Sequence, residues 1–220
     1  MEFRPMLRTL LVSVLSATLL ISCGSDDSNS NPAPDYPVLA NDNTAAIDVS
    51  RGDYACYDMT TSFGLIKLAV DEKYAPTTAE NFRKYAVLGF YDDLIFHRVI
   101  PNFMIQGGGF DAGLNRRETG NAIDIESRNG LKNYRGRLAM ARTSAPNTAT
   151  SQFFINTVNN SFLNEDEASD GYGYTVFGGV IEGMDVVDAI EAVDTGSVGG
   201  MSNVPVENVF INSVREASCS

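Results

Sequence analysis

The stretch FHRVIPNFMIQGGGF, residues 96–110, decides how the rest of the chain is interpreted. It has the apolar, β-branched and aromatic composition of strands, and we predict one strand at 94–99 and another at 102–107. The stretch also contains the only histidine of the chain, His97, beside a cation, Arg98. An amide, Gln106, and three glycines close it. Polar groups in so apolar a run indicate a functional role or a buried partner.

The flanking sequence repeats this texture of short strand-like runs separated by glycine and polar clusters. We predict further strands at 63–70, 136–142, 151–157, 174–181 and 207–214. Two stretches have helical periodicity instead, 75–91 with Thr77 or Thr78 as the cap, and 183–196. Many antiparallel strands with two isolated helices predict an all-β dominated fold. We expect a closed β-barrel capped by two α-helices, because closure removes sheet edges.

Composition narrows the possible functions. The 220 residues are 44% apolar and 20% charged, which suits one folded domain with additional segments. A net charge of −12 argues against nucleic acid as a partner. One histidine and three scattered cysteines offer no metal-ligand spacing, so we expect no metal and no cofactor.

Two familiar motifs can be set aside. The run GGGFDA, residues 107–112, satisfies the G-x-G-x-x-A dinucleotide pattern, but no helical pattern follows it. A hydrolase would need His97 as its base, yet the chain has no G-x-S-x-G motif, and His97 lies in an apolar strand. We therefore assign His97 a structural role.

The N-terminal region has the layout of an export signal. Residues 1–22 carry a basic start, an apolar stretch and small residues before Cys23, which is typical of a cleaved signal peptide. The ending LISC resembles a bacterial lipobox and predicts lipidation of Cys23; an ordinary secretory signal is the alternative. Residues 23–50 read as a flexible tether and 51–220 as the folded domain. The resemblance to bacterial lipoproteins implies an exported protein anchored by lipid to the outer membrane and facing the periplasm.

Three long motifs resemble the cyclophilin family of peptidyl-prolyl isomerases, particularly its bacterial secreted members. They are residues 96–110, LAMARTSAPNTATSQFFINT at 138–157 and YTVFGGVIEGMDVVDAI at 174–190. The resemblance extends over residues 54–214. It implies an eight-stranded antiparallel barrel with two capping helices, and activity on proline-containing unfolded or extended polypeptides.

The resemblance also implies the site. Arg98 would be the catalytic residue, donating a hydrogen bond to the prolyl nitrogen as the amide twists. The substrate-binding residues would be Phe103, Met104, Gln106, Ala141, Arg142, Gln152, Phe154, Phe162, Leu163 and Tyr174. Gln106 would either anchor substrate backbone or brace Arg98, and Ala141 with Arg142 would offer main-chain groups. The alternative for the apolar members is that they belong to the barrel core.

Three positions depart from many relatives, namely Phe162 in place of tryptophan, Tyr174 in place of histidine and Arg142 in place of asparagine. The family's first and last strands are antiparallel neighbours, which implies a disulfide between Cys56 and Cys219; two unpaired thiols are the alternative. We expect a monomeric isomerase that assists exported proteins, with a peptide-binding or adhesion module without turnover as the other possibility. The segment 113–130 and the acidic segment 164–171 either recruit partners or are solvated loops.

Overall fold

The computed structural model of the chain describes residues 47–219, so the predicted signal peptide, Cys23 and most of the predicted tether lie outside the described residues. The strands are β1 Tyr54–Thr61, β2 Gly64–Asp71, β3 Leu94–Ile95, β4 Arg98–Ile100, β5 Met104–Gly107, β6 Arg137–Met140, β7 Phe153–Asn156, β8 Val176–Glu182, β9 Thr195–Val198, β10 Met201–Pro205 and β11 Phe210–Ala217. The helices are η1 Val49–Arg51, α1 Pro76–Val87, η2 Ser161–Leu163 and α2 Met184–Glu191.

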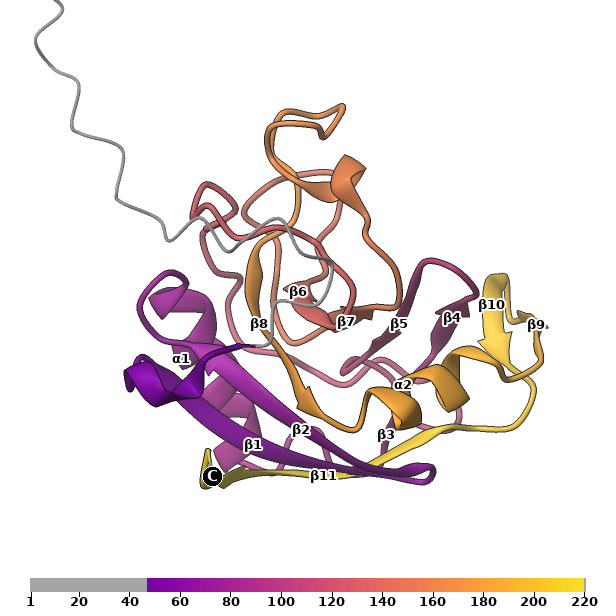
Figure 1. Ribbon diagram of the computed structural model, residues 1–220. Helices are drawn as coiled ribbons and strands as arrows, with labels where there is room; N and C mark the ends of the chain where they lie inside the picture. The colour runs from indigo at the N-terminus through magenta and orange to yellow at the C-terminus, as the bar shows by residue number, and fades with distance from the viewer. Residues whose placement is uncertain (1–46, 220) are drawn as a thin grey trace, which may run out of the picture. The chain divides into compact units, whose positions relative to one another are not determined.

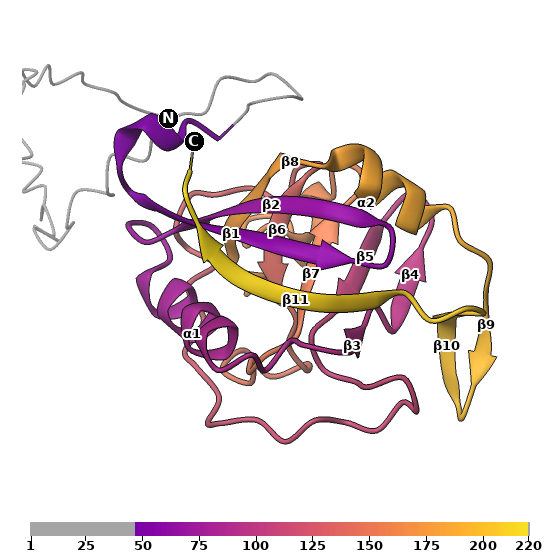
Figure 2. The same ribbon diagram turned by 90° about the horizontal axis from the view of Figure 1, so that it is seen from below.

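Nine strands form one strongly curled antiparallel sheet in the order β3-β11-β1-β2-β8-β6-β7-β5-β4. Its two edge strands, β3 and β4, are separated in the chain only by Phe96 and His97, so the curl returns the sheet to its starting segment (Figure 1, Figure 2). The two helices lie at different ends of this sheet. The predicted fold class is confirmed. The predicted strand at 94–99 is interrupted, which gives nine strands in place of eight. Within residues 47–219, no helix has the length and apolar character needed to cross a membrane.

Helix α1 buries one face against the inside of the sheet. Phe82 is fully buried, and its ring contacts those of Tyr57, Tyr91, Phe153 and Phe177 at centroid distances of 5.2 to 5.9 Å. These rings belong to the main apolar core. Such aromatic contacts add to the free energy of burial, so this cluster fixes the helix on the sheet.

The cap of α1 comes from a distant segment, and the predicted capping by Thr77 or Thr78 was wrong. The carboxylate of Glu126 accepts hydrogen bonds from the backbone N–H groups of Thr77 at 3.0 Å and Thr78 at 2.8 Å. The Thr78 hydroxyl also donates to Glu126, at 2.6 Å. A carboxylate here satisfies the free N–H groups of the first turn and opposes the positive end of the helix dipole. Glu126 thereby pins the segment 113–130 to the barrel.

Strand β1, the end of α2 and the β9–β10 hairpin differ from the sequence predictions. Strand β1 was absent from the strand-like runs, which began at Phe63. The predicted helix 183–196 ends at Glu191, and the residues after it form the β9–β10 hairpin, which was not predicted. Its signal is the glycine pair at 199–200 between two short polar runs, a pattern typical of a two-residue hairpin connection.

A disulfide joins Cys56 of β1 to Cys219, with the Cα atoms 5.1 Å apart. Cys56 lies opposite Ala217 in the β1–β11 pair, so the two strands bring the cysteines together. The bond closes a sequence separation of 163 residues. Restricting so long a loop in the unfolded chain stabilises the fold by about 2–5 kcal/mol.

Candidate active site

The candidate site is built on the outer face of four adjacent strands. Successive residues of a strand point to opposite faces, so each strand supplies one set of side chains to the core and another to the outside. Val99, Ile105 and Ile155 belong to the main core. Their neighbours in sequence, Arg98, Gln106 and Phe154, therefore face the other way.

Strand register places four of these outward residues in one row. Arg98 of β4 lies opposite Gln106 of β5. Gln106 in turn lies opposite Phe154 of β7, and Phe154 lies opposite Ala139 of β6. Residues from three distant parts of the sequence thus become lateral neighbours, about 5 Å apart from strand to strand. The row joins a cation, an amide and an aromatic ring.

A chain of side-chain hydrogen bonds orients Arg98. Its Nη1 atom donates to Oε1 of Gln106 at 3.2 Å, and Nε2 of Gln106 donates to Oε1 of Gln152 at 3.0 Å. Two roles were predicted for Gln106, and this hydrogen bond is the one expected if Gln106 braces Arg98. Burial lowers the pKa of Arg98 from its ordinary value, but a guanidinium remains protonated in proteins. Arg98 is therefore a fixed cation in a half-buried position.

The third glycine of the opening stretch leaves room for this chain. A Cβ atom on Gly109 would lie 2.5 Å from Cγ of Gln152 and 2.7 Å from its Nε2. A side chain at position 109 would therefore require Gln152 to move. The glycine lets Gln152 pass close to the backbone and reach Gln106.

An apolar cluster separate from the main core forms the floor beside Arg98. It consists of Met104, Ala139, Phe154, Leu163 and Val176, with Phe103, Ala141 and Tyr174 among the half-buried residues packed against it. These apolar site residues are largely buried, but they form a cluster of their own, on the opposite side of the sheet from the main core.

These residues surround a hollow of about 510 Å³. Its lining residues are Arg98, Phe103, Met104, Gln106, Ala141, Arg142, Phe154, Phe162, Leu163 and Tyr174. The structure therefore brings together ten of the eleven residues predicted as catalytic or substrate-binding. Gln152 does not line the hollow and reaches it through Gln106.

Residues that sequence reasoning missed hold two lining segments from behind. Nδ2 of Asn160 donates two hydrogen bonds, one to the carbonyl of Phe103 at 2.8 Å and one to Oδ1 of Asn156 at 2.7 Å. Nδ2 of Asn133 donates to the carbonyl of Leu163 at 3.2 Å. All three asparagines are buried. Only Asn156 carries a signal in the sequence, since it is a polar residue at the end of a buried strand, which favours hydrogen bonding to buried polar groups.

The rim combines one exposed ring with main-chain groups. Phe162 is 56% exposed and stacks on Phe103 with ring centroids 5.7 Å apart. The N–H of Ala141 donates to the carbonyl of Gln152 at 3.0 Å, so this N–H is already used within the sheet. The side chain of Arg142 turns instead toward the acidic segment 164–171.

The charges of that acidic segment are largely paired. Asp166 accepts from Lys132 at 2.7 Å, Glu165 pairs with Arg128 at 2.9 Å, and Asp170 binds Arg142. Pairing with the surrounding cations explains how the acidic run is held against the fold, and it supports the solvated-loop alternative over partner recruitment.

His97 is a buried neutral group behind Arg98. It is 3% exposed, and its ring lies 4.6 Å from that of Phe110. Burial, together with the positive charge of Arg98, lowers the pKa of His97 to about 4. The imidazole is therefore uncharged at neutral pH and packs as part of the fold, in agreement with the structural role expected for it. Among residues 47–219, no group of three or more His, Cys, Asp or Glu side chains is placed to hold a metal ion.

Comparison with known proteins gives one family. The family model described as "Cyclophilin type peptidyl-prolyl cis-trans isomerase/CLD" matches residues 56–216. Peptidyl-prolyl cis-trans isomerase B of Escherichia coli is 53% identical over 155 residues, which cover 70% of this chain and 94% of that protein. Peptidyl-prolyl cis-trans isomerase A of Dickeya dadantii is 48% identical over 157 residues, covering 71% of this chain and 82% of that protein.

A solved structure agrees with the fold. The crystal structure of a cyclophilin type peptidyl-prolyl cis-trans isomerase from Cryptosporidium parvum superposes with a TM-score of 0.63 at 28% identity, covering 76% of this chain and 99% of that one. A second crystal structure of the same protein, determined in the presence of the dipeptide ala-pro, superposes with a TM-score of 0.61.

Proposed function

Because the chain belongs to the cyclophilin family of peptidyl-prolyl cis-trans isomerases, we propose that it accelerates rotation about Xaa-Pro bonds, at the hollow around Arg98. The observation that carries this proposal is the guanidinium of Arg98, held by Gln106 beside an apolar floor. The relatives' names support the reaction, since the proteins similar to this chain are called peptidyl-prolyl cis-trans isomerases.

The reaction needs no nucleophile. Partial double-bond character gives the amide a rotation barrier of about 18–20 kcal/mol, and X-Pro bonds exchange over tens to hundreds of seconds. A catalyst must bind the twisted amide better than either planar isomer. Twisting localises the lone pair on the prolyl nitrogen, which becomes a hydrogen-bond acceptor only in that state.

Arg98 can make that difference. Its guanidinium is permanently charged and planar, and Gln106 holds one of its nitrogens, so another can point at the prolyl nitrogen. A hydrogen bond from a charged donor contributes about 1.5–3 kcal/mol, or roughly 10- to 150-fold in rate. The apolar floor excludes water from this bond, and a bond in a drier site is stronger.

The substrate would lie with its proline ring on the apolar floor, against Phe103, Met104 and Phe154, which together with Leu163 offer a nonpolar surface. The carbonyl of Ala141 is the main-chain group that we propose pairs with the extended peptide. Substrates are therefore unfolded or extended proline-containing segments. A pocket that binds the proline ring and the adjacent backbone places few other restrictions on the sequence of the substrate.

We propose that the protein is exported and tethered to the bacterial envelope by lipid on Cys23, at the outer membrane and facing the periplasm. The apolar stretch ending in LISC supports this location, and so does the Cys56–Cys219 disulfide, because disulfides persist in oxidising compartments. Its substrates would then be exported polypeptides.

Exchange NMR on a short Ala-Pro peptide tests the isomerase proposal. Wild-type protein should produce exchange cross-peaks between cis and trans proline resonances, and Arg98→Ala should reduce the catalysed exchange rate by about 10- to 150-fold. Arg98→Lys should recover little, because an ammonium lacks the planar fork. Peptide binding without exchange in the wild type would favour the alternative of a binding or adhesion module.

Expression of the full chain with and without Cys23→Ser tests the anchor. The wild type should fractionate with membranes and carry the mass of attached acyl chains, and the variant should be released. A wild type without added lipid mass would overturn the anchor and leave the isomerase proposal intact.

A further inference from the structure

Arg142 is the most completely bonded cation of the hollow. Its side chain is 3% exposed. Nε donates to the carbonyl of Gly173 at 2.8 Å, and Nη1 donates to the carbonyls of Thr143 at 3.0 Å and Ser144 at 3.4 Å. Nη2 binds the carboxylate of Asp170. A guanidinium has five N–H donors, so these four acceptors leave little capacity for a peptide.

The partner carboxylate is itself fixed. Oδ1 of Asp170 accepts from the backbone N–H groups of Tyr172 at 2.9 Å and Gly173 at 3.1 Å, which folds the segment into a tight turn. The hydrogen bond from Arg142, with these backbone bonds, lowers the pKa of Asp170 to about 2. The ion pair is therefore present throughout the neutral pH range.

Gly173 lets this turn pack against the hollow. Its φ of 62° lies in the left-handed region, and a Cβ atom there would lie 2.6 Å from the backbone nitrogen of Glu165 and 2.7 Å from the carbonyl oxygen of Leu163. The N–H of the next residue, Tyr174, donates to that carbonyl at 2.9 Å. The turn and Leu163 are thus held directly against each other.

The guanidinium also covers the ring of Tyr174. The Cζ atom of Arg142 lies 4.5 Å from the ring centroid, within cation–π distance. The Tyr174 ring meets that of Phe154 edge to face, at 5.7 Å and 79°. Arg142, Tyr174 and Phe154 thus form a continuous series of contacts that ends at the apolar floor.

From these contacts we infer that Arg142 is a positioning residue, which sets the wall of the proline pocket by clamping the ring of Tyr174 and the turn at 170–173. The inference rests on the proposed function and deepens it. Arg142 acts through Tyr174 on peptide affinity, whereas Arg98 acts on the rotation step. Loss of the clamp should therefore weaken peptide binding and leave the exchange rate of bound peptide nearly unchanged.

The test measures the dissociation constant for an Ala-Pro peptide and, separately, the exchange rate at saturating protein. Arg142→Ala should raise the dissociation constant about five- to tenfold and change the exchange rate at saturation by less than about twofold. In a Tyr174→Ala background, Arg142→Ala should have no further effect, because residues that act as one unit are non-additive. Arg142→Lys should bind with intermediate affinity, because it keeps a cation but loses the fork.

Arg135→Ala is the matched control. Arg135 also pairs with an aspartate, Asp188, at 2.7 Å and donates to a backbone carbonyl, that of Thr157, at 2.7 Å. It does not line the hollow. Its removal should leave the dissociation constant unchanged, which separates a clamp on the pocket from the general loss of a surface ion pair.

Asp170→Asn keeps the oxygen that forms the turn, and it removes both the charge and the oxygen that accepts from Arg142. It therefore tests the inference even if Arg142→Ala does not fold. We expect about a threefold weaker binding for this variant. Wild-type affinity in both variants, or additive effects of Arg142→Ala and Tyr174→Ala, would overturn the inference. A wild type that binds peptide without exchange would overturn the proposed function alone, since the affinity cycle could still be measured.

Discussion

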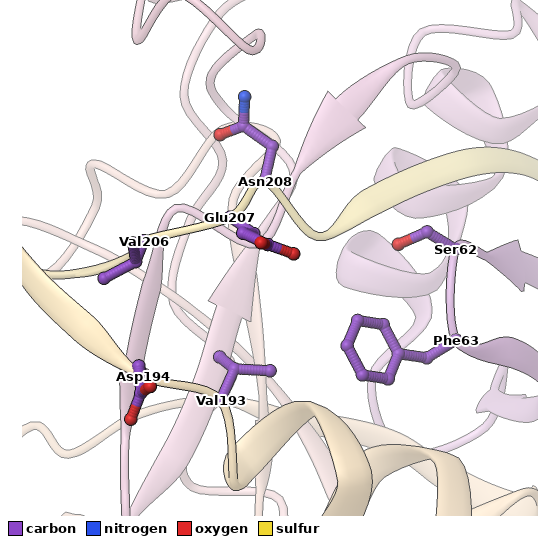
Figure 3. Close-up of a pocket in the computed structure, with 7 residues that line it drawn as sticks. All are labelled: Ser62, Phe63, Val193, Asp194, Val206, Glu207 and Asn208. Carbon is purple, nitrogen blue, oxygen red and sulfur yellow. The ribbon is translucent and has the colours of Figure 1, made fainter.

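Two hollows of the barrel have nearly the same size and very different chemistry. The hollow around Arg98 has a volume of about 510 Å³. A second hollow, of about 540 Å³, lies where the β1–β2 turn, the end of α2 and the β10–β11 connection meet (Figure 3). Phe63, Val193 and Val206 give it apolar lining, with the carboxylates of Asp194 and Glu207 beside them.

In the first hollow, strand register places Arg98, Gln106 and Phe154 side by side. The Arg98 guanidinium is held by the amide of Gln106, which is in turn held by the amide of Gln152. In the second, among the described residues, neither the Asp194 nor the Glu207 carboxylate makes a hydrogen bond or ion pair, and no lining side chain is cationic. Volume therefore does not identify the site. What distinguishes the first hollow is a preorganised donor beside an apolar floor, since preorganised polar groups are what favour a transition state.

Removal of one ring from each hollow should have the largest effect. Phe154 is 4% exposed, and Phe154→Ala should lower the free energy of unfolding by about 3–5 kcal/mol in urea denaturation and also weaken peptide binding. Phe63 is 44% exposed, so Phe63→Ala should cost about 1 kcal/mol or less and leave peptide affinity unchanged. Equal losses from the two substitutions would remove the distinction between the hollows.

Acid should destabilise the fold through His97, which lies directly behind Arg98. Its pKa is about 4 in the folded state against about 6.5 unfolded. The unfolded chain thus binds the proton first, and stability is lost as the pH falls from 6.5 to 4. The total loss is about 3 kcal/mol. His97→Gln should remove this loss of unfolding free energy between pH 6.5 and 4. The contributions of the other titrating groups should be the same in the wild type and the variant. An unchanged pH slope would mean that His97 titrates normally.

The brace on Arg98 should have an intermediate effect. Gln106→Leu keeps the side-chain size and removes both hydrogen bonds, so it should lower the catalysed exchange rate about fivefold, as expected for a contribution of about 1 kcal/mol. Gln152→Ala should have a smaller effect of the same kind, because it acts one bond further away. Greater loss from Gln152→Ala than from Gln106→Leu would contradict this order.

The smallest effect should come from the second hollow. The double variant Asp194→Asn with Glu207→Gln removes both carboxylates, neither of which pairs with another of the described residues. Exchange rate and peptide affinity should stay within about twofold of the wild type, and stability within about 0.5 kcal/mol. A large loss of isomerisation in this variant would assign the second hollow a part in turnover.

The same contrast explains what the sequence could predict. The strand-like runs and the family resemblance predicted the barrel and the residues that surround the first hollow. They could do so because the composition of a strand and the order of motifs are local properties of the chain. The Glu126 cap on α1 and the Asp170 clamp on Arg142 were missed, because each joins segments 28 or more residues apart. The β9–β10 hairpin was missed because the apolar stripe of α2 was extended through Val193, past the true end of the helix at Glu191.

The most direct measurement is a titration of ¹⁵N-labelled protein with an Ala-Pro peptide, followed by backbone amide shifts and relaxation dispersion. We predict shift changes and millisecond exchange broadening at residues that line the hollow around Arg98, including Phe103, Arg142 and Tyr174. Residues 193–208 around the second hollow should stay unperturbed. Exchange broadening centred on Val193, Val206 and Asn208, with an unperturbed Arg98 region, would contradict this prediction.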